Sequence, residues 1–215
     1  MARIAETERL LIMTEIERSF WQRPDIVLAG MDEVGRGPLA GPVVSACVVL
    51  PPEPFIQYVN DSKKLTEKRR DQLAKEIRKL SSGFALGWVW PDVVDEINIL
   101  EATKRAFETA YARMPILVTD VLVDALNGLK ISARQHPFVH GDARSYLIAA
   151  ASIIAKVERD AYMVEQDAIY PQYGFARNKG YGTAEHIDAL KAYGPCPIHR
   201  RSFLKKLFGD DVYAR

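Results

Sequence analysis

The chain has 215 residues, of which 48% are hydrophobic and 27% are charged, a balance typical of a globular protein with one sizeable core. Its formal net charge of +1 excludes no class of partner, because binding to nucleic acid depends on a local basic patch rather than on the total. The two cysteines exclude a disulfide framework. The absence of a signal peptide and of a membrane-length apolar run predicts a cytoplasmic protein.

The first half of the chain shows apolar periodicities that are separated by glycine and proline. In chain order they predict an amphipathic helix at 4–20, strands at 26–31 and 43–50, a charged helix at 65–80, a strand at 84–90 and a helix at 91–113.

The second half predicts a strand-like stretch at 117–124, whose first residues are left open between strand and loop, and a short strand near 138–140. A helix is expected at 145–166, where the small residues at 149–152 suit close packing, and another at 184–193. Strands that cluster first and then alternate with helices predict an α/β fold, with a mixed sheet covered by helices.

The most informative stretch begins where the first strand is predicted to end. Asp32 and Glu33 lead directly into a glycine-rich loop, Gly35-Arg36-Gly37. Carboxylates can hold a metal ion, while glycine amides and an arginine can hold an anion. This combination indicates phosphodiester chemistry.

Two further acids are expected at ends of elements, Asp124 after a middle strand and Asp142 before the long helix. Strand ends converge in an α/β sheet, and four clustered carboxylates repel one another unless a cation neutralises them. Mg²⁺ or Mn²⁺ fits this donor set, and two such ions roughly 3.5–4 Å apart serve phosphodiester hydrolysis. A single Asp in such a place is more often a cap or a surface residue, and Asp142 could simply cap the following helix.

The glycine loop also matches a relaxed dinucleotide-binding fingerprint, Gly35-x-Gly37-x-x-Ala40. That fingerprint must open a helix, whereas here Pro38 and Pro42 interrupt the segment and a strand follows. The context therefore excludes a dinucleotide site.

Several separate blocks, in order and with consistent spacing, resemble the motifs of ribonuclease HII, the type 2 ribonuclease H. The resemblance covers about residues 26–203. Its blocks are Asp32–Val43, Asp61–Leu65, Val123–Asp124, Gly141–Asp142, Ile148–Asp160, Tyr170–Phe175, Lys179–Thr183 and Gly194–Phe203.

The resemblance implies an RNase H-like fold with a small C-terminal helical element. It also implies hydrolysis of the RNA strand of RNA–DNA hybrids, and nicking of DNA duplexes 5′ of embedded ribonucleotides with 5′-phosphate and 3′-hydroxyl products. The expected domains are an N-terminal extension at 1–25, a catalytic domain at 26–170 and a C-terminal substrate-binding element at 171–215.

The same resemblance assigns roles to particular residues. The four metal-binding acids of the family fall on Asp32, Glu33, Asp124 and Asp142, with Mg²⁺ or Mn²⁺ as cofactor. The residues that contact the substrate are Gly35, Arg36 and Gly37 at the ribose 2′-OH and backbone, Lys63 near the phosphates, and Tyr181 against the neighbouring deoxyribose. The 2′-OH is what distinguishes RNA from DNA at one nucleotide.

The expected partners are RNA–DNA hybrids and DNA duplexes that contain ribonucleotides, with roles in DNA replication and ribonucleotide excision repair. We expect a monomer without membrane contact, and Leu204–Arg215 shows no clear sliding-clamp-binding peptide. One departure is Arg144, where the family usually has a lysine. Residues 127–140 match no block of the family.

Alternatives remain at this point. Ribonuclease HIII is the nearest rival, but it carries an extra N-terminal domain and lacks the loop arginine, whereas only about 25 residues precede the first strand here. A catalytically silent hybrid-binding module is the alternative outside the enzymes. Tyr181 could be a core tyrosine in a turn, and the basic residues around 63–79 and 177–206, Lys63 and Arg200 among them, could be solvated helix faces.

Overall fold

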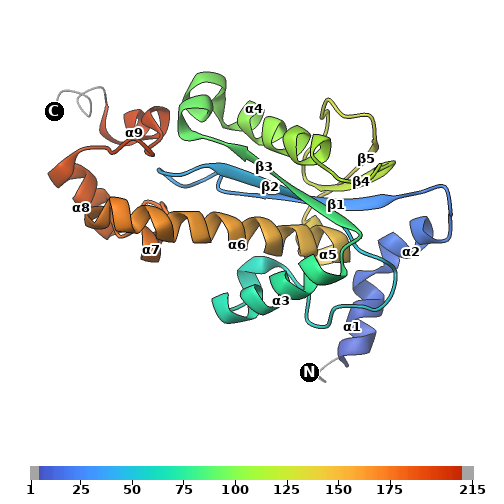
Figure 1. Cartoon of the computed structure of the whole chain (residues 1–215). Coiled ribbons are helices and arrows are strands. Elements are labelled where there is room, and N and C mark those ends of the chain that lie inside the picture. Colours follow the sequence, from blue (N-terminus) through green and yellow to red (C-terminus); the bar gives the residue numbers. More distant parts are fainter. Residues whose placement is uncertain (1–4, 210–215) are drawn as a thin grey trace.

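A five-stranded mixed sheet forms the centre of the molecule, in a computed structural model that describes residues 5–209 (Figure 1). The strand order is β3-β2-β1-β4-β5. β1 pairs with β2, and β2 with β3, in antiparallel orientation, whereas β1 pairs with β4, and β4 with β5, in parallel orientation. The strands are β1 (Leu28–Val34), β2 (Val43–Val49), β3 (Gly83–Val89), β4 (Asp120–Asp124) and β5 (Arg134–Phe138). The predicted α/β class with a mixed sheet is confirmed.

Helices cover both faces of the sheet. Figure 1 shows α4 (Pro91–Ala112) on one face, and α6 (Tyr146–Ile169) with α3 (Glu67–Leu80) on the other. The alternation of side chains along β2 explains why both faces are apolar, because Ala46 and Val48 join the core on the α6 side while Cys47 and Val49 join the core on the α4 side. β2 is therefore buried throughout its length.

The N-terminal segment forms two helices, α1 (Glu6–Met13) and α2 (Glu15–Trp21), where one continuous helix was predicted. The break lies at Thr14, whose hydroxyl donates to the carbonyl of Leu10 at 2.8 Å and competes with regular helical geometry. The buried carboxylate of Glu17 then accepts hydrogen bonds from Ser145 Oγ and Leu147 N, and so fastens α2 to the start of α6.

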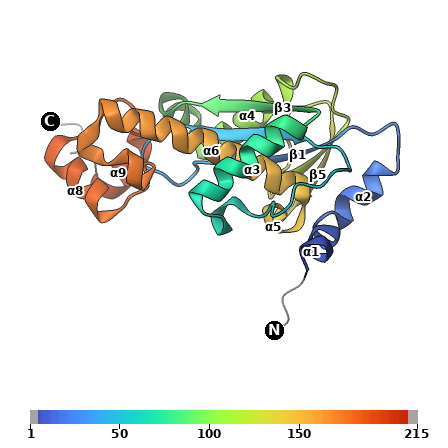
Figure 2. The ribbon, with the colours of Figure 1, turned by 60° about the horizontal axis from the view of Figure 1, so that its bottom comes forward.

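Further short helices gather at the opposite end of α6 (Figure 2). Besides the predicted α8 (Ala184–Tyr193), these are the 3₁₀ turn Pro171–Tyr173, α7 (Phe175–Asn178) and α9 (Arg201–Phe208). An isolated bridge pairs His199 with Ala40, so the C-terminal element lies against the glycine-rich loop. The last six residues of the sequence, part of the stretch inspected for a clamp-binding peptide, lie outside the described residues.

Several boundaries differ from the prediction in ways that concern the acids. β1 continues to Val34, so Asp32 and Glu33 lie within the strand rather than after it. Asp142 lies within a separate short helix, α5 (Gly141–Arg144), and Ser145 caps α6 by accepting from Ile148 N. The alternative that Asp142 merely caps the long helix is therefore wrong.

Other boundaries move by smaller amounts. The segment before residue 120 is loop, and β5 begins at 134 rather than near 138. The backbone of α4 breaks at Asn98, whose φ is 68°, and its side chain accepts from Leu100 N and Glu101 N to restart the helix. Among the described residues, no helix is both long and apolar enough to cross a membrane.

Two glycines mark the tightest contacts between the sheet and its helices among the described residues: Gly87 of β3 lies against α4, and Gly30 of β1 lies against α6. A Cβ atom on Gly30 would lie 2.1 Å from the carbonyl carbon of Leu147 and 2.5 Å from Ile148 N. Because both atoms belong to the backbone of α6, no side-chain rearrangement can make room. The strand and the helix are thus in direct backbone contact.

We predict that Gly30→Ala lowers the free energy of unfolding by about 3 kcal/mol or more, since the new methyl group forces α6 away from β1. Urea unfolding followed by circular dichroism measures the change. Gly128→Ala is the control, because a Cβ there meets nothing within 4 Å and the φ of 71° costs only about 1–2 kcal/mol. Equal losses in the two variants would contradict the packing argument.

Candidate active site

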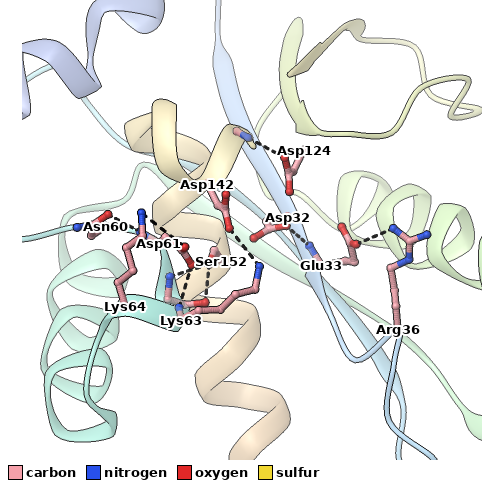
Figure 3. Close-up of polar contacts among 12 residues, drawn as sticks. Asp32, Glu33, Arg36, Asn60, Asp61, Lys63, Lys64, Asp124, Asp142 and Ser152 are labelled. Carbon is pink, nitrogen blue, oxygen red and sulfur yellow. Dashed lines mark hydrogen bonds and ion pairs between the residues drawn. The ribbon is translucent and has the colours of Figure 1, made fainter. Parts of the chain in front are cut away.

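The two adjacent acids of β1 lie beside the acids of two other elements (Figure 3). Asp32 is 6% exposed, and its Oδ1 accepts from Glu33 N at 2.7 Å. Asp124 ends β4, the parallel neighbour of β1, and Asp142 follows in α5. Strand pairing therefore brings residues 32 and 124 together, as the sequence predicted.

Polar contacts hold the outer acids in place. Asp124 Oδ1 accepts from Gly141 N at 2.7 Å, which ties the end of β4 to α5. Asp142 Oδ2 faces Lys63 Nζ at 3.3 Å, and Glu33 Oε1 faces Arg36 Nη1 at 3.4 Å. Each of the four carboxylates thus uses one oxygen in a hydrogen bond within the described residues and keeps the other for a further ligand.

The carboxylates perturb one another's protonation. Burial, followed by the charges of Glu33 and Asp124, raises the pKa of Asp32 well above its usual range. Burial also raises the pKa of Glu33, against the opposing effect of Arg36. The pKa of Asp124 rises for the same first reason, with a contribution from Asp142. A group of acids in this state favours either bound protons or a bound cation.

The donor set is suited to a hard divalent cation. Four carboxylates gather here, and carboxylate oxygens are the ligands that Mg²⁺ and Mn²⁺ prefer. Within residues 5–209, no three His, Cys, Asp or Glu side chains are already arranged to hold one ion. The chemistry of the site fits a divalent ion, and binding requires the free oxygens to turn toward it.

Lys63 comes to the acids on a short 3₁₀ turn, Ser62–Lys64. Asp61 caps this turn by accepting from Lys63 N at 2.9 Å, and Ser62 Oγ meets Ser152 Oγ of α6 at 2.7 Å. Burial alone would lower the pKa of Lys63, but the charge and hydrogen bond of Asp142, together with the charges of Asp32 and Asp61, outweigh burial and raise that pKa. Sequence reasoning singled out Lys63 but missed the supporting pair Ser62 and Ser152, because their contact spans 90 residues.

The glycine loop and Tyr181 lie together. A Cβ on Gly37 would be 3.9 Å from the Tyr181 ring and would meet nothing else within 4 Å. Tyr181 is 41% exposed, so the alternative of a core tyrosine is wrong. Its backbone oxygen lies 2.9 Å from Nδ1 of the buried His186, which holds the turn that carries the ring. An open aromatic face therefore borders the loop.

The basic C-terminal residues divide between surface and interior. Arg200, counted by sequence with the basic residues of a solvated or nucleic-acid-binding surface, is 0% exposed. Its guanidinium donates to backbone carbonyls of the glycine loop. In the sequence, the burial of Arg200 is indicated only by the neighbouring apolar and aromatic residues of Ile198–Phe203. That pattern does not show which groups the guanidinium binds.

Comparison with known proteins places this arrangement in a family. Residues 29–206 match the family model described as Ribonuclease HII. The ribonuclease HII of Caldanaerobacter subterraneus subsp. tengcongensis is 50% identical over 202 residues, which cover 94% of this chain and 84% of the relative. The chain belongs to the ribonuclease HII family.

Solved structures agree with the family assignment. The crystal structure of ribonuclease H2 from Pyrococcus horikoshii superposes with a TM-score of 0.71 at 28% identity, over 87% of this chain and 99% of that one. Ribonuclease HII of Archaeoglobus fulgidus, solved in complex with PCNA, gives a TM-score of 0.65 at 29% identity, over 78% and 88% of the two chains. The RNase H-like fold with C-terminal helices is thereby confirmed.

Family membership also gives the class of activity. The chain is an endonuclease of the ribonuclease H type that acts on RNA–DNA hybrids, and enzymes of this type typically depend on a divalent metal. The two rival hypotheses, a ribonuclease HIII and a silent binding module, are not supported.

We predict that Asp32→Asn raises the free energy of unfolding of the metal-free protein at pH 7 by about 1 kcal/mol or more. The folded-state pKa of Asp32 is raised, so its protonated carboxyl group contributes stability at low pH, and this stability is lost as the pH rises through that pKa and the group ionises. The asparagine amide stays neutral at every pH in this range, so the variant does not lose that stability at pH 7. Urea unfolding in EDTA between pH 4 and pH 8 measures it.

Asp120, at the other end of β4, is the matched control. Burial alone would raise its pKa, but hydrogen bonds from Arg134, His136 and Thr119 outweigh burial and lower the pKa to about 2. Its stability contribution is present above the unfolded pKa and disappears as the pH falls. Asp120→Asn should therefore destabilise the protein at pH 7, and a shift of the same sign in both variants would refute the electrostatic account.

Proposed function

We propose that, beyond hydrolysing RNA–DNA hybrids, this enzyme nicks DNA duplexes on the 5′ side of single embedded ribonucleotides, leaving 5′-phosphate and 3′-hydroxyl ends. The observation that carries this proposal is that four acids from three elements gather where β1 leads into the glycine loop, whose Gly37 borders the exposed ring of Tyr181. The acids proposed for cleavage thus lie next to a surface that can recognise a single sugar.

In this proposal Asp32, Glu33, Asp124 and Asp142 hold Mg²⁺ or Mn²⁺ through their free oxygens. Bound divalent ions would neutralise the carboxylates, polarise the scissile phosphodiester and lower the pKa of a bound water. The protein itself contributes position. Gly141 N fixes Asp124, and Lys63 fixes Asp142, so that the acids stay oriented while the substrate enters.

The cationic side chains beside the acids can hold the phosphates. The Lys63 side chain is largely exposed although its ammonium faces Asp142, so it can meet a phosphate from the solvent side. Arg36 is also exposed, and its planar guanidinium can bind a phosphate through two parallel hydrogen bonds. Both residues would counter the negative charge that the substrate brings to an acidic site.

The sugar is recognised by the loop and the tyrosine. Gly35, Arg36 and Gly37 offer backbone groups to the 2′-OH, because Gly37 has no side chain to cover them. The ring of Tyr181 borders Gly37 and can pack against the next deoxyribose. We assign catalysis to residues 26–170, substrate binding to 171–215, and treat 1–25 as an N-terminal extension.

We propose that the enzyme acts as a monomer on RNA–DNA hybrids and on ribonucleotide-containing duplexes in replication and repair. The relative from Archaeoglobus fulgidus forms a complex with PCNA. In the present chain, Leu204–Arg215 shows no clear clamp-binding peptide.

We predict that Asp142→Asn lowers nicking of a duplex with one ribonucleotide at least about a hundredfold, while duplex affinity is retained, because the variant loses a cation ligand and keeps the shape of the side chain. A gel assay with and without Mg²⁺, with the cut position mapped, measures this. Asp71→Asn, on the exposed face of α3, is the control and should cut normally. Undiminished nicking by Asp142→Asn would remove this residue from the site.

We also predict that Tyr181→Ala weakens cleavage at a single ribonucleotide at least about fivefold more than cleavage within a long hybrid, because only the former depends on a deoxyribose next to the cut. Tyr181→Phe keeps the ring and should retain most of the activity. Steady-state kinetics on the two substrates give the ratio. Equal losses on both would contradict a role in sensing the junction.

A further inference from the structure

Two buried arginines in this enzyme have no acidic partner. Arg159 of α6 and Arg200 before α9 are both 0% exposed, and within the described residues neither forms an ion pair. Burial disfavours a charge, and lowers the pKa of both guanidinium groups, that of Arg200 to about 9. A buried guanidinium without an anion must be stabilised by hydrogen-bond acceptors, and here also by a nearby aromatic ring: Arg200 lies 5.1 Å from the centre of the Phe203 ring, and Arg159 lies 6.0 Å from that of Tyr181.

Every acceptor of Arg200 is a carbonyl of the glycine loop. Nη2 donates to Gly35 O at 2.5 Å and to Gly41 O at 2.8 Å, and Nε also donates to Gly41 O at 3.0 Å. Nη1 donates to Arg36 O at 3.1 Å and to Pro38 O at 3.0 Å. One side chain thus binds four carbonyls within seven residues of chain.

Arg159, on α6, also donates only to backbone carbonyls in the hydrogen bonds found among the described residues. Nε donates to Pro42 O at 3.0 Å, and Nη2 to Ala40 O at 3.0 Å. Nη1 donates to Lys179 O at 2.9 Å, in the turn that leads to Tyr181. The two guanidinium groups together hold the loop and the tyrosine turn against α6.

This arrangement determines which way the loop's donors point. In a planar trans peptide, the carbonyl of one residue and the N–H of the next point in opposite directions. Because the carbonyls of Gly35 and Arg36 point at Arg200, the N–H groups of Arg36 and Gly37 point away from it. Within the described residues, neither N–H has a hydrogen-bond partner in the protein. Two consecutive donors thus face outward where Gly37 leaves the surface open.

The loop needs this fixation because its conformation is unusual. Gly35 has φ of 96°, and a Cβ there would lie 2.5 Å from both Pro42 O and the Nε of Arg159. The N–H of Leu39 is already bound to Gly180 O at 2.8 Å. Only arginine offers five donors in a rigid planar fork, so a lysine of equal charge could satisfy few of these carbonyls.

We propose that Arg200, assisted by Arg159, is a positioning residue for ribose discrimination: it turns the loop's carbonyls inward so that the N–H groups of Arg36 and Gly37 face the 2′-OH. The inference rests on the proposed recognition of the sugar by this loop. Arg200 does not touch the substrate. It acts through the peptide planes that it binds.

The test compares Arg200→Lys with Arg134→Lys. Arg134 makes a two-bonded ion pair with Asp120 near the opposite end of β4, so its replacement by lysine is a matched loss of arginine geometry far from the loop. Dissociation constants are measured for a duplex with one ribonucleotide and for the same duplex in all-DNA form. Both variants are made in the Asp142→Asn background, which prevents cutting.

We expect Arg200→Lys to lower the ratio of the two affinities at least fivefold, while affinity for the all-DNA duplex changes less than twofold, because the charge is kept. Arg134→Lys should leave the ratio within twofold. An unchanged ratio in a folded Arg200→Lys protein, or an equal loss on both duplexes, would overturn the proposal. If the Asp142→Asn parent itself fails to prefer the ribonucleotide duplex, the recognition proposed above fails instead.

A second measurement decides the matter even if Arg200→Lys does not fold. In the Asp142→Asn protein, the amide protons of Arg36 and Gly37 should exchange rapidly with solvent when free. They should become protected by the ribonucleotide duplex at least tenfold more than by the all-DNA duplex. Protection in the free protein, or equal protection by both duplexes, would refute the orientation argued here.

Discussion

The direct backbone contact between α6 and β1 at Gly30 is the constraint on which the rest of the site depends. β1 carries Asp32 and Glu33 and continues into the glycine loop. Along its length, α6 meets three parts of the site. Its start follows α5 and Asp142, Ser152 holds the turn of Lys63, and Arg159 reaches the loop. Since helices and strands are stiff, seating one on the other fixes all three sets of distances at once.

The acids illustrate what such a rigid frame permits. Carboxylates that repel one another would separate on a mobile loop, but here they are fixed to a strand, a strand end and a short helix. Asp120 lies on the same strand as Asp124 but has different neighbours. Hydrogen bonds from Arg134 and His136 help to lower the pKa of Asp120 to about 2, whereas the pKa of Asp124 is raised. One end of β4 stabilises the fold, and the other stores electrostatic strain that a cation can relieve.

Much of this arrangement could be predicted from sequence because it depends on local pattern. Buried strands, the long helix at α6 and the approximate placement of the four acids all follow from apolar periodicity and turn residues. The boundaries were less accessible. Apolar spacing continues through Thr14, so the hydroxyl that divides α1 from α2 left no periodic signal. Likewise the separate helix of Asp142 is only four residues long, too short for a pattern to define.

The partners of the buried arginines lay beyond sequence reasoning for a different reason. A guanidinium usually indicates an acidic partner or a phosphate, and the acceptors of Arg200 are backbone carbonyls more than 150 residues away, which carry no side-chain signature. Charge composition therefore placed Arg200 on the surface. Physically the burial is reasonable, because a loop with several unpaired inward carbonyls and a buried cation without an anion satisfy each other. Asp32 and Glu33 are then separated from the outward amides of Arg36 and Gly37 by only a few residues of one continuous backbone that both arginines anchor. Under the proposed recognition of the ribose, this short stretch of backbone sets where the cut falls relative to the sugar.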